Sequence, residues 1–183
     1  MIYFIGGAPR AGKSLLSQRL CTTLHVGWVS TDLLMELLRV ANVVGRKMEW
    51  DAAPEAITAN AEWFFPYLER FVWGVCSLAD HYVIEGVDFL PAQVAQLSAQ
   101  YPARAVFLGC SQITLEDLTR FPGRSPGYGR LPEELRRQIV EDVPRWSAFI
   151  RQEADRFGYA YVDMASDFSE RLSEAENVLT TRL

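Results

Sequence analysis

Near the amino terminus, two glycines flank four other residues and are followed by a lysine and a serine. The stretch reads Gly7, Ala8, Pro9, Arg10, Ala11, Gly12, Lys13 and Ser14, with Leu15 next. This spacing is that of a phosphate-binding loop, or P-loop. Glycines have no Cβ atom, so the backbone can curl and turn its N–H groups inward, and the free amides of a helix N-terminus favour an anion. We therefore predict that residues 7–15 bind the phosphates of a nucleotide.

Lys13 and Ser14 are the two residue types that a nucleoside triphosphate site requires at these positions. The lysine reaches the β- and γ-phosphates, and the serine hydroxyl is a ligand for Mg²⁺. Lys13 is one of two lysines in a chain with sixteen arginines, which indicates a need for a compact point charge here. The alternative is a glycine-rich turn that matches by accident. An apolar run at 2–5 and helical spacing at 15–20 favour the P-loop, because strand, loop and helix are its usual context.

Asp32 is the first candidate for the reacting end of the site, because it comes shortly after the apolar run at 26–29. A carboxylate there is predicted to accept the proton of an attacking hydroxyl, or to hold that hydroxyl in line. The alternative is a cap at the start of the next helix, for which Ser30 and Thr31 are rivals.

Glu85 and Asp88 follow the apolar run at 82–84. A carboxylate at the end of a buried strand is costly without a positive partner, so we predict that Glu85 serves Mg²⁺ together with Ser14. A salt bridge to an arginine is the alternative. Asp88 is predicted either to orient a substrate hydroxyl or to cap the following helix, and both interpretations stay open.

A loop rich in glycine and proline at 121–130 lies among five arginines. They are Arg120, Arg124, Arg130, Arg136 and Arg137. We predict a lid over about 114–137 that closes on the phosphates, excludes water and neutralises the transferring charge, with Arg120 and Arg124 as its catalytic residues. At least one of Arg120, Arg124 and Arg130 is expected to contact phosphate. The alternative is a set of solvated arginines, since this chain uses Arg almost everywhere in place of Lys.

Apolar runs and helical spacing alternate along the chain. Strands are predicted at 2–5, 26–29, 82–84, 105–108 and 159–162, and helices at 13–24, 33–38, 54–78, 91–100, 114–119, 132–157 and 167–179, with a loop at 42–53. This alternation predicts an α/β protein with a parallel sheet covered on both faces, in which ligands bind beyond the carboxyl ends of the strands. Pro66 is expected to kink or split its helix, and Pro144 to bend another. Four aromatic residues off the apolar stripe at 54–78 are either core or a pocket wall: Trp63, Phe65, Tyr67 and Trp73.

The composition predicts one domain spanning residues 1–183, with 49% hydrophobic residues and a net charge of −5. The negative charge argues against a nucleic-acid or anionic-membrane partner. The sequence contains no run of about eighteen apolar residues, so no membrane span is expected. Cys21, Cys76 and Cys110 are widely spaced, which favours free thiols over a zinc site or disulfides. No basic segment precedes the first strand, so no signal peptide is expected. We expect a cytoplasmic monomer or homodimer.

Together these motifs resemble the P-loop kinases of small molecules and nucleotides, the group that includes adenylate, shikimate and gluconate kinases. The resemblance implies a three-layer P-loop fold with a five-stranded parallel sheet in the order 2-3-1-4-5, helices on both faces and an arginine-rich lid. It also implies ATP as phosphoryl donor, Mg²⁺, and an acceptor pocket in the helical region at about 31–80. The loop at 164–167 would then lie close to the adenine.

The resemblance to adenylate kinases stops at the residues that hold an acceptor phosphate. Those enzymes have an arginine three residues after the aspartate, where this chain has Met35, and a Gly-Phe-Pro-Arg segment where Gly86 is followed by Val87, Asp88 and Phe89. The segment at 83–91 is more similar to the 2-phosphoglycerate kinase group, and the aspartate after the second strand resembles the base of antibiotic phosphotransferases. The leading prediction is an ATP-dependent kinase that phosphorylates a hydroxyl of a small-molecule metabolite. A nucleotide or nucleoside kinase, or a nucleotide-binding switch without phosphotransfer, is the alternative.

Overall fold

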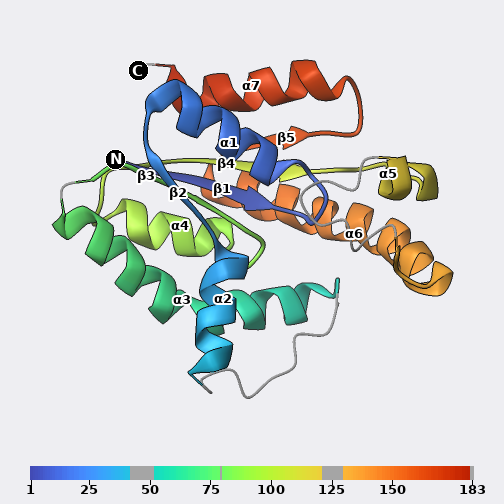
Figure 1. Cartoon of the computed structure of the whole chain (residues 1–183), viewed down its shortest axis with the longest axis horizontal. Helices are drawn as coiled ribbons and strands as arrows, with labels where there is room; N and C mark the ends of the chain where they lie inside the picture. Colours follow the sequence, from blue (N-terminus) through green and yellow to red (C-terminus); the bar gives the residue numbers. More distant parts are fainter. Residues whose placement is uncertain (42–51, 79, 121–129, 182–183) are drawn as a thin grey trace.

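Five strands form one parallel sheet at the centre of the protein (Figure 1). The computed structural model describes residues 1–41, 52–78, 80–120 and 130–181. The strands are β1 (Ile2–Gly7), β2 (Gly27–Ser30), β3 (Tyr82–Glu85), β4 (Ala103–Gly109) and β5 (Ala160–Asp163). Their order is β2-β3-β1-β4-β5, and each neighbouring pair is parallel. The predicted fold class and strand order are confirmed.

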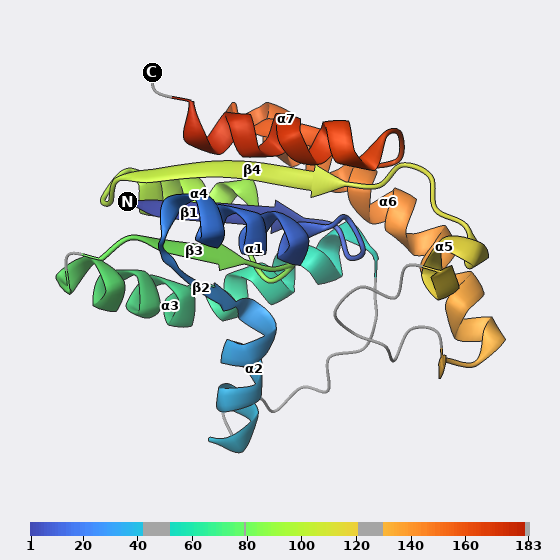
Figure 2. The same ribbon diagram turned by 45° about the horizontal axis from the view of Figure 1, so that its top comes forward.

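Helices cover both faces of this sheet. They are α1 (Lys13–Leu24), α2 (Thr31–Val40), α3 (Pro54–Ser77), α4 (Pro91–Ser98), α5 (Leu115–Arg120), α6 (Glu133–Phe157) and α7 (Phe168–Thr180). Figures 1 and 2 show α1 and α7 on one face and α3, α4 and α6 on the other, while α2 projects away from the end of β2. The result is the three-layer arrangement expected of strands that alternate with helices.

The sheet separates two hydrophobic cores because successive side chains of a strand point to opposite faces. Ile5 and Val106 pack with the buried residues of α1 and α7. Phe4 and Phe107 point to the other face, where they join the buried side chains of α3, α4 and α6. Phe89 stacks edge-on against both phenylalanines, with ring centroids 5.5 Å and 6.4 Å away. Both faces of the strands are therefore apolar, as a covered parallel sheet requires.

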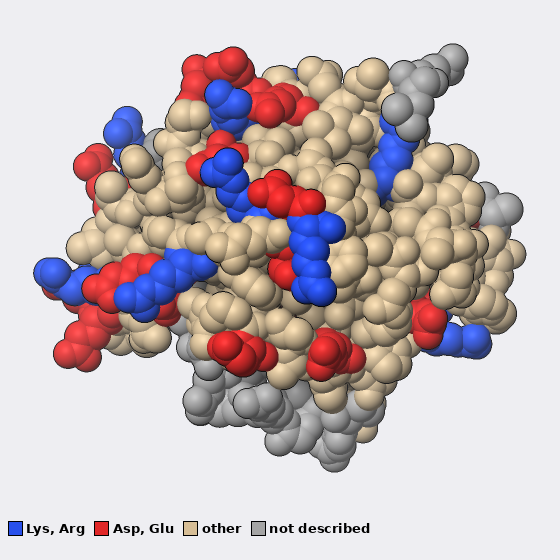
Figure 3. Space-filling model, turned by 180° about the vertical axis from the view of Figure 1, so that it is seen from behind, with Lys and Arg blue, Asp and Glu red and all other residues tan. Residues whose placement is uncertain are grey.

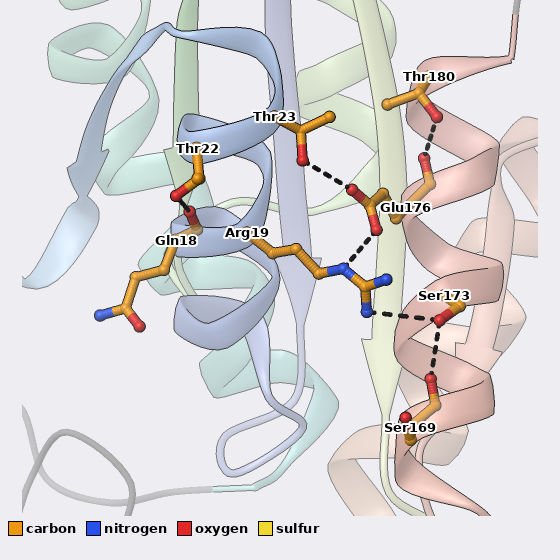
Figure 4. Close-up of polar contacts among 8 residues, drawn as sticks. All are labelled: Gln18, Arg19, Thr22, Thr23, Ser169, Ser173, Glu176 and Thr180. Carbon is orange, nitrogen blue, oxygen red and sulfur yellow. Dashed lines mark hydrogen bonds and ion pairs between the residues drawn. The ribbon is translucent and has the colours of Figure 1, made fainter.

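Polar contacts join α1 to α7 (Figure 4). The guanidinium of Arg19 pairs with Glu176 at 2.5 Å and donates a longer hydrogen bond to Ser173 at 3.4 Å. The hydroxyl of Thr23 donates to the second oxygen of Glu176 at 3.2 Å. These contacts fix α7 beside α1, the helix that begins with Lys13 and Ser14.

The proline and aromatic residues of α3 behave largely as the sequence predicts. α3 is continuous from Pro54 to Ser77, so Pro66 does not split it, and its two halves run in different directions in both views (Figures 1 and 2). Three of the four off-stripe aromatics, at 63, 65 and 67, are half-buried against the core. Trp73 is exposed, and the guanidinium of Arg70 lies 3.8 Å from its ring centroid.

Most predicted boundaries differ from the observed ones by one or two residues, a common error because element ends are set by hydrogen bonding. β2 begins one residue later than predicted, and β4 begins at Ala103 instead of residue 105. Most of the predicted loop at 42–53 and residues 121–129 of the predicted lid lie outside the described residues.

No helix among the described residues is both long and apolar enough to cross a membrane. On the face opposite Figure 1, acidic and basic side chains are interspersed (Figure 3).

Candidate active site

The segment between β1 and α1 curls at the carboxyl edge of the sheet. Three residues take positive φ angles: 129° at Gly7, 65° at Arg10 and 83° at Gly12. A Cβ atom on Gly7 would lie 1.9 Å from the carbonyl oxygen of Leu108, so only glycine fits there. The amide of Ala8 donates to the same carbonyl at 2.8 Å. The predicted P-loop segment is therefore anchored on β4 as it turns toward α1.

Lys13 lies folded back inside this segment. Its side chain is only 7% exposed, and its ammonium donates hydrogen bonds to the carbonyl oxygens of Gly7 at 3.2 Å and Ala8 at 2.7 Å. Burial lowers the pKa of the ammonium, and the carboxylates of Glu85, Asp32 and Asp88 offset this only in part. The loop thus encloses a cation that main-chain oxygens hold. Phosphate oxygens are stronger partners for an ammonium than neutral carbonyls are.

Ser14 and Glu85 are brought together as an oxygen pair beside Lys13. The β1–β3 register places Glu85 next to Ile5, so β3 ends beside the start of the loop. The Ser14 hydroxyl donates to Oε1 of Glu85 at 2.9 Å, and Glu85 is 3% exposed. Among the described residues no group of three or more His, Cys, Asp or Glu side chains could hold a metal. A hydroxyl and one carboxylate fit Mg²⁺, which binds oxygen and takes few protein ligands when phosphates and waters complete its shell.

Asp88 is the centre of a second, buried polar network. It is 1% exposed and accepts hydrogen bonds from the hydroxyl of Thr31 at 2.5 Å and from the amide of Asn60 at 2.9 Å. Burial raises the pKa of its carboxyl group, although the two hydrogen bonds and Lys13 oppose the shift. Gly86 permits this packing, since a Cβ atom there would lie 1.8 Å from Oγ1 of Thr31. Asp88 does not serve as the N-cap of α4, a position that Leu90 occupies.

Asp32 lies in the first turn of α2 and its side chain is exposed. The N-cap position of α2 is Ser30, which makes no side-chain capping hydrogen bond, and the Thr31 hydroxyl is taken by Asp88. The charge of Asp32 acts on both Lys13 and Asp88, so all three groups share one electrostatic environment. Its role toward an acceptor hydroxyl stays a prediction.

The structure describes four of the five arginines of the predicted lid. Arg120 ends α5, where it pairs with Glu116 at 3.6 Å, and Arg124 lies outside the described residues. Arg130 is exposed, and Arg137 pairs with Glu133 within α6. The structure thus gathers Lys13, Ser14, Asp32, Glu85 and Asp88 at one edge of the sheet, and phosphate contacts by the arginines stay predictions.

Two residues near the site had no role in the sequence-based prediction. Asn60 is a half-buried polar residue three positions after Ile57, at the border of the buried stripe of α3, and that position is the signal that points to it. Phe168 begins α7, and its ring would lie 2.9 Å from a Cβ atom on Gly12. No pattern in the sequence marks Phe168, because its proximity to the loop arises from the docking of α7 on α1.

Comparison with solved structures identifies the fold. An uncharacterized protein from Eubacterium ventriosum is 16% identical, with a TM-score of 0.56 over 100% of this chain and 99% of that one. A shikimate kinase from Bacteroides thetaiotaomicron is 16% identical, with a TM-score of 0.53 over 97% of this chain and 94% of that one. A sugar kinase from Janibacter is 12% identical, with a TM-score of 0.50 over 98% of each chain. No family model and no curated protein matches the sequence.

The class that fold and topology define is the three-layer fold of P-loop small-molecule kinases, which the shikimate kinase and sugar kinase also have. The resemblance inferred from the sequence is thereby confirmed for the fold.

Proposed function

We propose that this protein is an ATP-dependent kinase that transfers the γ-phosphoryl group to a hydroxyl of a small-molecule metabolite. The observation that carries the proposal is the buried Lys13 ammonium inside a curled glycine loop, beside the Ser14–Glu85 pair. A glycine loop at a helix N-terminus, one enclosed ammonium and an oxygen pair together match the needs of a magnesium-bound polyphosphate. The kinase fold of the similar structures supports the same class of reaction.

Each residue of the loop and its surroundings has a stated task in this proposal. When bound, Mg·ATP supplies the phosphoryl group and its metal neutralises phosphate charge. Lys13 exchanges its bonds to the carbonyls of Gly7 and Ala8 for bonds to phosphate oxygens. Ser14 and Glu85 provide oxygens for the metal. Asp32 accepts the proton of the attacking hydroxyl, or holds that hydroxyl in line.

The adenine is proposed to lie against the start of α7. Met164 and Phe168 both approach Gly12, at the end of the loop, and Phe168 is 40% exposed. A half-exposed aromatic ring beside a phosphate loop offers a stacking surface for a base. The Arg19–Glu176 contact supports this placement, since it holds α7 against α1 (Figure 4). Lid arginines, including Arg120 and Arg124, are proposed to neutralise the moving phosphoryl group.

The experiment compares the wild type with Lys13→Ala, using Gln18→Ala as a control with an exposed side chain on the same helix. Calorimetric titration measures Mg·ATP binding, and γ-labelled ATP shows whether label reaches a hydroxyl acceptor. We expect Lys13→Ala to keep its fold by circular dichroism and to lose label transfer by at least about 10²-fold. Full turnover in that variant would reject the assignment.

The same assay separates the alternatives. Label that reaches only nucleoside monophosphates would favour a nucleotide kinase. Tight ATP binding with no transfer to any acceptor would favour a switch module. No heat on titration with Mg·ATP would remove the basis for all three.

A further inference from the structure

We propose that the acceptor is a hydroxyl compound without an acid group, either neutral or carrying an ammonium, and that Asn60 binds it. The inference rests on the proposed kinase function, because it places the acceptor beside Asp32 in the region of α2 and α3. It excludes carboxylate- and phosphate-bearing acceptors.

The charge balance around Lys13 is unfavourable for a second anion. The charges of three carboxylates, Asp32, Glu85 and Asp88, act on the ammonium. Glu85 and Asp88 are buried, so solvent screens them poorly. An acceptor that enters beside a bound polyphosphate meets an excess of negative charge. A second anion in that place is disfavoured unless dedicated cations hold it.

α2 and the first four turns of α3 offer no such cation. α2 carries one basic residue, Arg39, which forms an ion pair with Glu36. α3 carries none between Pro54 and Glu69, and the first is Arg70, whose guanidinium covers the Trp73 ring. Within these two helices, both arginines are therefore engaged by side chains of their own helix, and neither is placed to bind a carboxylate or phosphate of the acceptor.

Asn60 lies on α3 beside the buried network of Asp88. Its amide nitrogen donates a hydrogen bond to Oδ1 of Asp88 at 2.9 Å. Among the residues the structure describes, none takes its second N–H or its carbonyl oxygen. The Asp88 contact fixes the orientation of the amide, and Asp88 in turn is tied to Thr31, the neighbour of Asp32. A fixed amide with one free donor and one free acceptor suits a hydroxyl or an amine.

The test measures label transfer from γ-labelled Mg·ATP with a metabolite library sorted by charge. The library includes matched triads that share a hydroxyl skeleton: glucose, glucosamine and gluconate, and glycerol, aminopropanediol and glycerate. It also includes 2-phosphoglycerate, a phosphate-bearing acid. We expect transfer to neutral or ammonium compounds at rates at least about tenfold above those of the acid of the same skeleton.

Transfer to an acid or phosphate compound at an equal or higher rate would overturn the inference and leave the kinase function intact. Failure of every neutral and ammonium compound, in a protein whose ATP turnover depends on Lys13, would overturn it as well. A different result would refute the kinase proposal itself: the wild type would then bind no Mg·ATP in the calorimetric titration.

Asn60→Ala tests the residue with the best acceptor that the library yields. We expect the acceptor KM to rise about five- to tenfold while the KM for ATP is unchanged, since one or two acceptor hydrogen bonds are lost. Thr58→Ala is the matched control, because its hydroxyl bonds to the Pro54 carbonyl of its own helix. Asn60→Gln, which keeps the amide, is expected to recover part of the loss. An unchanged acceptor KM in Asn60→Ala would refute the role of Asn60.

Discussion

The hydroxyl of Ser14 donates a hydrogen bond to Oε1 of Glu85 at 2.9 Å, which joins the start of α1 to the end of β3 across 71 positions of sequence. The pair exists because β1 and β3 are neighbours in the sheet, so the loop after one meets the last residue of the other. It presents a hydroxyl and a carboxylate to the same small volume.

Glu85→Gln keeps the size of the side chain and its ability to accept from Ser14, and removes one charge. We expect the apparent affinity for Mg²⁺ to weaken about 10- to 100-fold, because a neutral amide is a poorer ligand for a hard cation. Initial rates of ADP formation against free Mg²⁺ at saturating ATP measure this. Glu62→Gln, exposed on α3, is the control. The same Mg²⁺ dependence in Glu85→Gln and wild type would contradict a metal role.

Phe168→Ala tests the base site without touching the phosphate loop. Loss of a stacking ring costs about 1–3 kcal/mol per base, so we expect the Kd of Mg·ATP to rise at least about fivefold. The affinity for inorganic tripolyphosphate is expected to be unchanged, because it has no base. Calorimetric titration with both ligands separates the effects. Phe157→Ala, an exposed phenylalanine at the end of α6, is the control, and equal losses for both ligands would point to damage of the loop.

Gly86→Ala tests the close approach of β3 and α2. The new methyl group would lie 1.8 Å from Oγ1 of Thr31, which forces the Thr31–Asp88 pair apart. We expect the free energy of unfolding to fall by about 1–3 kcal/mol. Gly74→Ala is the matched control: it lies in α3 with nothing within 4 Å of a new Cβ atom. Because alanine favours a helix over glycine by about 1 kcal/mol, Gly74→Ala is expected to be neutral or stabilising. Urea unfolding compares them, and similar losses in both variants would refute the steric argument.

The fold was predictable because its signals are local. The Gly-x₄-Gly-Lys-Ser spacing at Gly7–Ser14 marks a strand-to-helix turn, and the apolar runs mark buried strands. Glu85 was predictable as a partner of Ser14 for a geometric reason. Carboxyl ends of parallel strands meet at one edge of the sheet, so residues distant in sequence converge there.

Contacts that arise from helix docking were not predictable in the same way. Asn60 meets Asp88 only because α3 packs beside the end of β3, and Phe168 meets Gly12 only because α7 packs on α1. Asp88 was predicted to orient a hydroxyl or cap a helix: Leu90 occupies the cap position of α4, Asp88 accepts hydrogen bonds from Thr31 and Asn60, and its role toward a substrate hydroxyl stays a prediction. Such contacts depend on distances between elements that periodicity does not encode.

The carboxyl groups of Asp88 and Asp163 are expected to change the pH dependence of folding stability in opposite directions. Burial raises the pKa of the Asp88 carboxyl group. Burial also acts on Asp163, but hydrogen bonds from Ser111 and Ala165 outweigh it and lower the pKa of that carboxyl. A raised pKa means that the folded state binds the proton more tightly than the unfolded state, and a lowered pKa means the reverse.

Asp88 contributes stability that is present below its unfolded pKa of about 4 and is lost as pH rises through the higher folded pKa. The Tm of the wild type minus that of Asp88→Asn is therefore expected to decrease from about pH 4 upward and then level off. The Tm of the wild type minus that of Asp163→Asn is expected to increase with pH. The increase begins below the lowered pKa of the folded state and ends slightly above the unfolded pKa of about 4. Calorimetry at fixed ionic strength measures both. A difference for Asp88→Asn that rises with pH would show that hydrogen bonding to Thr31 and Asn60, and not burial, controls the Asp88 carboxyl group.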